Sequence, residues 1–135
     1  MSKYQLPGDL GLIIDLALTE DIGDGDITSL LISEDCSAKA HIICKEHAIL
    51  CGTPWVNEVY KKIDNSIQIE WNFEEGTCVE GGDSIASIAG QARTILTGER
   101  TALNFLQTLS GTATIVREYL IALKGTNTKL LDTRK

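Results

Sequence analysis

The sequence lacks any long apolar run. None of its 135 residues belong to a stretch approaching the roughly 18 apolar residues of a membrane-spanning helix, and the first ten residues contain no signal-like apolar segment. Basic residues are also scarce, with 12 Lys and Arg against 19 Asp and Glu and a net charge of −7. Nonspecific nucleic-acid binding depends on neutralising phosphates. These absences predict a soluble, cytoplasmic protein without membrane or nucleic-acid partners.

Closely spaced cysteine pairs are absent as well. The chain has no C-x-x-C motif, and its thiols are spread over a long stretch, at Cys36, Cys44, Cys51 and Cys78. Zinc sites normally show closer ligand pairs, and disulfides are rare in cytosolic proteins. We therefore expect reduced, mostly buried thiols, with neither a disulfide nor a metal site. The two histidines, His41 and His47, show no partner pattern that indicates catalysis.

Apolar periodicity predicts a mixture of helices and strands. Asp9 can cap a first helix, and Thr53 followed by Pro54 is typical of a second helix start. Alternating apolar residues predict strands, which we place at 37–44, 67–73, 84–89 and, near the end, 128–131. Ser110 and Gly111 predict a break between the central helix and a following one that begins at Thr112.

The central helix carries two stripes. Apolar residues recur at helical spacing along one side, at Ile95, Ala102, Leu103, Leu106 and Leu109. Polar residues recur along another, at Arg93, Thr97, Arg100, Asn104 and Gln107. Two guanidinium groups one heptad apart can bind carboxylate or phosphate, because the arginine fork matches these groups bidentately. A solvated helix face is the alternative.

Three stretches point to a family. They read EDIGDGDIT at 20–28, GERTALNFLQTLSGTAT at 98–114 and LLDTRK at 130–135. In these residues and in their order, the chain closely resembles the quinolinate phosphoribosyltransferases, the carboxylating nicotinate-nucleotide pyrophosphorylases of NAD synthesis. The resemblance implies an α+β fold. Residues 1–111 would form an N-terminal α/β sandwich (hammerhead-like) domain that includes the central helix, and residues 112–135 would begin an incomplete α/β barrel.

The resemblance also implies a reaction. Family members join quinolinate to phosphoribosyl pyrophosphate with Mg²⁺, releasing carbon dioxide and pyrophosphate to give nicotinate mononucleotide. By this resemblance Arg100 contacts quinolinate in the neighbouring subunit's site, so a homodimer or larger homo-oligomer is expected. The substrate-binding residues near the end are Thr133, Arg134 and Lys135. No catalytic residue is assigned within the chain, and the Mg²⁺ ligands are expected beyond it.

A barrel that stops after one strand leaves open hydrogen-bonding edges. We therefore expect this chain to be the N-terminal portion of a longer enzyme and to be inactive alone. The ModD-like proteins of molybdenum-transport operons and the nicotinate phosphoribosyltransferases share the architecture and remain alternatives. A non-catalytic binding domain is another. The stretch 76–90 resembles biotinyl and lipoyl carriers, but it lacks the lysine that carries their prosthetic group.

Overall fold

The computed structural model describes residues 5–23, 25 and 31–131. In them helices and strands are mixed, which confirms the expected α+β fold. The elements in chain order are α1 (Leu10–Ile22), β1 (Ser37–Ile43), β2 (Ala48–Ile49), α2 (Thr53–Ile63), β3 (Gln68–Trp71), β4 (Cys78–Val79), β5 (Ser84–Gln91) and α3 (Ala92–Ala122). Within these ranges, no helix combines the length and the apolarity needed to cross a bilayer.

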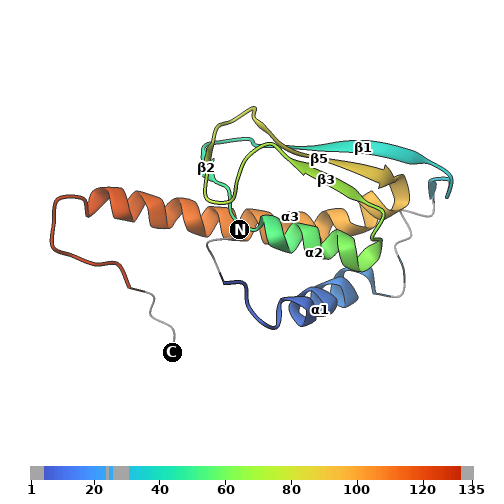
Figure 1. Cartoon of the computed structure of the whole chain (residues 1–135), viewed down its shortest axis with the longest axis horizontal. Coiled ribbons are helices and arrows are strands. Elements are labelled where there is room, and N and C mark those ends of the chain that lie inside the picture. Colours follow the sequence, from blue (N-terminus) through green and yellow to red (C-terminus); the bar gives the residue numbers. More distant parts are fainter. Residues whose placement is uncertain (1–4, 24, 26–30, 132–135) are drawn as a thin grey trace.

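The strands form an antiparallel sheet in the order β1-β5-β3, together with a separate small ribbon of β2 and β4. Helices α2 and α3 cover one face of this sheet, and α1 lies on the far side of those helices (Figure 1). Side chains alternate across a strand. Ile69 and Trp71 of β3 are accordingly half-buried, whereas Gln68 and Glu70 are exposed.

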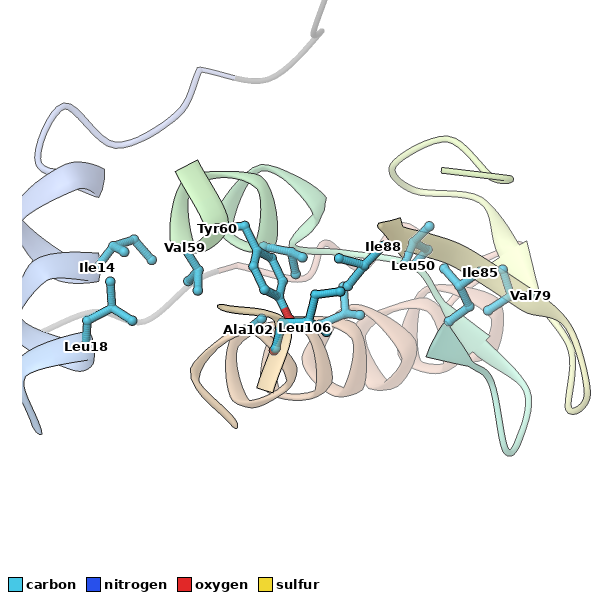
Figure 2. Close-up of a cluster of buried hydrophobic side chains, with 12 residues drawn as sticks. Ile14, Leu18, Leu50, Val59, Tyr60, Val79, Ile85, Ile88, Ala102 and Leu106 are labelled. Atoms are coloured by element: carbon cyan, nitrogen blue, oxygen red, sulfur yellow. The ribbon is translucent and has the colours of Figure 1, made fainter. Parts of the chain in front are cut away.

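The core lies between the sheet and helices α2 and α3, and it continues between these helices and α1. Helix α1 contributes Ile14 and Leu18, and α2 contributes Val59 and Tyr60 (Figure 2). The apolar stripe predicted for the central helix faces this core, because its fully buried members are Ile95, Ala102 and Leu106. The stripe prediction is therefore confirmed, and it explains why α3 packs against α2 and β5.

Helix α2 begins one residue earlier than its sequence suggests, at Thr53 instead of Pro54. Gly52, with φ 108°, occupies the capping position, and Thr53 is already helical. The carboxylate of Glu75 caps the helix instead, accepting hydrogen bonds from the backbone N–H groups of Gly52 at 2.7 Å and Thr53 at 3.0 Å. A carboxylate at this end also complements the helix dipole. The cap comes from a distant loop, so local sequence patterns do not reveal it.

Replacing Glu75 by alanine is expected to lower the free energy of unfolding by about 1–3 kcal/mol, because two N–H groups lose a charged acceptor. Urea denaturation measures this change. Glu74→Ala is the matched control, since that neighbouring side chain is exposed. Equal stability losses in the two variants would show that the Glu75 cap contributes little.

The predicted break at Ser110–Gly111 is wrong, because α3 runs unbroken from Ala92 to Ala122. Two hydroxyl groups on this part of the helix hold the β2 segment. Ser110 Oγ accepts from the Cys51 N–H and donates to the Cys51 carbonyl, both at 3.0 Å. Thr114 Oγ1 accepts from the Ile49 N–H at 2.9 Å. These contacts on either side of Gly111 favour a continuous helix. The domain boundary after residue 111 stays a prediction.

The strand predicted at 128–131 is also wrong for this chain. These residues have no regular secondary structure, and Leu130 and Leu131 are 43% and 76% exposed. A strand needs a hydrogen-bonding neighbour, and in the described part of the chain no strand lies beside them. The apolar pattern of this segment therefore lacks the surface against which it would be buried.

Candidate functional site

The polar stripe of α3 contains two arginines with different surroundings. Arg93 is committed to the loop before β1. Its Nε donates to the Ile32 carbonyl, and its Nη1 donates to Glu34 Oε1 at 2.8 Å. Arg93 thus ties the loop to the start of α3. The predicted pair of anion-binding guanidinium groups is reduced to a single candidate.

Arg100 is that candidate. Its side chain is exposed on α3, and within the described ranges it has neither an ion pair nor a hydrogen bond. Successive side chains of a helix point about 100° apart. The surroundings of the two adjacent residues therefore indicate the side of α3 on which Arg100 lies. Thr101 is buried on one side, whereas Glu99 on the other lines a groove. A free guanidinium on a rigid helix can bind a carboxylate or phosphate group with two parallel hydrogen bonds.

Thr101, the residue next to Arg100, links α3 to α1. Its side chain is 1% exposed, and its hydroxyl donates to Asp21 Oδ2 at 2.5 Å. Asp21 belongs to the acidic stretch 20–28, so this bond joins two of the three family-like segments across 80 positions of sequence. Sequence reasoning missed this contact. The only signal available was that both residues belong to motifs of the same family.

A groove of about 860 Å³ lies between β1 and α3, but it does not suit a polyanion. Its walls include the apolar side chains of Ala40 and Ile42 on β1 and of Leu103 on α3. Carboxylates of Glu99 and Glu118 line it as well, and they would repel an anionic ligand. The anion-binding candidate therefore lies beside this groove, on the outer surface of α3.

The two strongly shifted groups near α2 are both unsuited to proton transfer at neutral pH. Burial raises the pKa of Tyr60 to about 12, and the negative charge of Glu99 adds to the effect. Its hydroxyl donates to the Ile95 carbonyl at 3.1 Å. Burial likewise raises the pKa of Cys51 to about 11, with further contributions from the hydrogen bond and charge of Glu75. A protonated thiol is a poor nucleophile.

The cysteines are free, as expected, but they are not mostly buried. Cys36 and Cys78 are exposed, and Cys44 and Cys51 are partly covered. The expectation of buried thiols is wrong because Cys36 and Cys44 flank β1 and Cys78 lies in β4, and both are edge strands with one open side. Exposed Cys78 has a partner that its spacing did not reveal, since its sulfur lies 3.6 Å from Nδ1 of His47.

Three of the predicted substrate-binding residues lie outside the described residues. These are Thr133, Arg134 and Lys135. Of the acidic stretch, only 20–23 and Gly25 are described. The substrate-binding roles of Thr133, Arg134 and Lys135 therefore stay predictions.

Comparison with known proteins connects this geometry to a family. The model of the quinolinate phosphoribosyl transferase N-terminal domain matches residues 26–110. A Bacillus subtilis protein, named as a probable carboxylating nicotinate-nucleotide pyrophosphorylase, is 38% identical over 86% of this chain and 40% of its own length. The chloroplastic nicotinate-nucleotide pyrophosphorylase of rice is 37% identical over 94% of this chain and 34% of its own.

Solved structures agree. The nicotinate-nucleotide pyrophosphorylase of Francisella tularensis is 40% identical, with a TM-score of 0.90 over 96% of this chain and 47% of the other. NadC of Streptococcus pyogenes is 32% identical, with a TM-score of 0.91 over 98% of this chain and 48% of the other. The chain thus spans less than half the length of these relatives. It belongs to the quinolinate phosphoribosyltransferase family and contains that family's N-terminal domain.

Proposed function

We propose that the complete protein containing this chain is a quinolinate phosphoribosyltransferase of NAD synthesis. It would convert quinolinate and phosphoribosyl pyrophosphate to nicotinate mononucleotide, carbon dioxide and pyrophosphate. The observation that carries this proposal is the match along most of the chain to relatives named as carboxylating nicotinate-nucleotide pyrophosphorylases. Those names favour quinolinate over nicotinate or a ModD-type substrate. The free cysteines support a cytoplasmic enzyme.

Both substrates are polyanions, and the exposed residues of α3 offer a group to bind one of them. Quinolinate carries two carboxylates, and Arg100 has a guanidinium without a partner in the described part of the chain. We assign Arg100 to a quinolinate carboxylate in the neighbouring subunit's site, which makes a homodimer the smallest active unit. Thr133, Arg134 and Lys135 would bind carboxylate and phosphate groups from their own subunit. Catalysis then depends on positioning and on electrostatic stabilisation, without a covalent nucleophile.

This chain would supply only part of each site. The C-terminal half of α3 exposes a row of large apolar side chains, at Ile115, Val116, Tyr119, Leu120 and Ile121. Exposed apolar surface of this extent usually marks an interface. The relatives' additional length is a natural source of cover for it. We therefore propose that the chain alone is inactive and that further segments complete the fold.

The proposed reaction uses Mg²⁺, but the described residues do not offer a suitable set of ligands for this ion. Mg²⁺ prefers an octahedral set of oxygen ligands. Among the described residues, the group close enough to hold a metal is His47, Cys78 and Glu80, which offers sulfur and nitrogen beside a single carboxylate. The Mg²⁺ that accompanies phosphoribosyl pyrophosphate would therefore be bound by other residues of the complete enzyme.

The proposal is tested with the protein expressed from the complete gene. Incubation with quinolinate, phosphoribosyl pyrophosphate and Mg²⁺ is expected to release pyrophosphate and to form nicotinate mononucleotide in equal amounts, as measured by chromatography. Nicotinate in place of quinolinate is the control and should give no product. Turnover of nicotinate without turnover of quinolinate would contradict the substrate assignment. Turnover by the 135-residue chain alone would contradict the assignment of this chain as an incomplete site.

A further inference from the structure

The ribbon of β2 and β4 brings together three side chains that are far apart in sequence. Ala48 pairs with Val79, and Ile49 pairs with Cys78. One step further along this antiparallel register, His47 comes opposite Glu80. Residues two apart on a strand share a face, so Cys78 and Glu80 project from the same side of β4. An imidazole, a thiol and a carboxylate therefore meet on one exposed surface.

The distances between their ligand atoms suit a small metal ion. His47 Nδ1 lies 3.0 Å from Glu80 Oε1, and Cys78 Sγ lies 3.6 Å from that nitrogen. The sulfur is 4.0 Å from Glu80 Oε1. Tetrahedral Zn²⁺ with bonds of about 2.3 Å to sulfur and about 2.0 Å to nitrogen and oxygen separates its ligands by roughly 3.3–3.6 Å. Side-chain adjustments of a few tenths of an ångström would convert the cluster into three ligands of one ion.

The backbone holds this arrangement without help from the three side chains. The Gly82 N–H donates to the Cys44 carbonyl, and the Cys44 N–H donates to the Asp83 carbonyl, both at 2.8 Å. Gly81 permits the approach, because a Cβ at that position would lie 2.9 Å from the Lys45 carbonyl oxygen. The turn after β4 is therefore fixed against the segment that leads to His47. A site on a fixed backbone needs little reorganisation to bind a metal.

We propose that His47, Cys78 and Glu80 form a binding site for a divalent transition metal of the zinc type. Thiolate and imidazole select Zn²⁺ or Co²⁺ over Mg²⁺ and Ca²⁺, which prefer oxygen. His47 and Glu80 are 55% and 68% exposed, so water can complete the fourth position. On binding, the Cys78 thiol gives its proton to solvent and the thiolate bonds to the ion. The site does not depend on the proposed transferase reaction.

Titration of the complete protein with Co²⁺ tests this site. One equivalent should bind and produce a sulfur-to-cobalt charge-transfer band, which Zn²⁺ should abolish by displacement. Cys78→Ser is expected to remove the band, and His47→Ala is expected to weaken Co²⁺ binding by at least about tenfold. The matched controls are Cys36→Ser and His41→Ala, both at exposed positions outside the cluster, and they should leave the titration unchanged.

Alkylation gives a second, independent measurement. Zn²⁺ should slow modification of Cys78 by iodoacetamide at least about tenfold, whereas exposed Cys36 should react at the same rate with and without metal. Mass spectrometry of the resulting peptides measures the extent of alkylation of Cys78 and Cys36 in one sample. The proposal is overturned if the band is missing in the unmodified protein, if it survives in Cys78→Ser, or if Zn²⁺ does not protect Cys78. The cluster would then be an ordinary surface ion pair of His47 and Glu80 beside a thiol.

Discussion

Replacing Arg100 by alanine in the complete enzyme is expected to lower kcat/KM for quinolinate by about 10–100-fold. The estimate follows from the loss of charged hydrogen bonds to a substrate carboxylate, worth about 1.5–3 kcal/mol. Stability should change by less than about 0.5 kcal/mol, because the side chain is exposed and makes no ion pair within the described ranges. Steady-state kinetics with each substrate varied in turn should place the effect on quinolinate and leave KM for phosphoribosyl pyrophosphate nearly unchanged.

Two further variants separate charge from geometry. Arg100→Lys keeps the positive charge but loses the bidentate fork, so an intermediate kcat/KM is expected. Arg117→Ala is the matched control, because it removes another exposed arginine from the same helix. A large loss of stability with unchanged activity in Arg100→Ala would show that Arg100 is a packing residue.

Mixing two inactive variants tests whether Arg100 serves the neighbouring subunit. A dimer of one Arg100→Ala subunit and one Arg134→Ala subunit would have one site with both substitutions and one with neither. If subunits pair at random, half of the dimers are mixed and one of their two sites is intact, so roughly a quarter of the wild-type activity should return. If Arg100 instead served its own subunit, every site would carry one substitution and the mixture would stay inactive.

The sequence predicted those features that depend on local periodicity. The alternation through β3 and the apolar stripe of α3 are visible in the structure because each element buries one side against the same core. Features that depend on distant partners were not predictable. The hydroxyl groups of Ser110 and Thr114 hold α3 against the β2 segment, and no local pattern showed that they would carry the helix through Gly111.

In the candidate site, too, some features were predictable from local spacing and others depend on residues far away in the sequence. The stripe that contains Arg93 and Arg100 was readable from spacing, but their different roles depend on Glu34, which pairs with Arg93 from 59 positions away. The register of a two-residue ribbon decides whether His47 meets Cys78. Strands this short carry too few residues for a pattern, which explains why the sequence indicated no metal ligands there.

Gly98 and Gly111, two glycines of the same helix, should respond oppositely to alanine. Gly98 is buried where α3 crosses α2, and a Cβ there would lie 2.7 Å from Tyr60 Cε1 and 3.0 Å from Ile63 Cδ1. The ring of Tyr60 cannot easily move away, since it is 2% exposed and its hydroxyl is bonded to the Ile95 carbonyl (Figure 2). At Gly111, apart from its two chain neighbours and the backbone of the same helix, no atom of the described residues lies within 4 Å of the corresponding position.

Gly98→Ala is therefore expected to lower the free energy of unfolding by about 1–2 kcal/mol. Overpacking costs about 1–3 kcal/mol, and the better helix propensity of alanine offsets up to about 1 kcal/mol of it. Gly111→Ala gains the propensity without the clash, so it should raise stability of the chain by about 0.5–1 kcal/mol. Urea denaturation of both variants provides the comparison. A stabilising effect at both positions would mean that α2 and α3 can separate enough to admit a methyl group at Gly98.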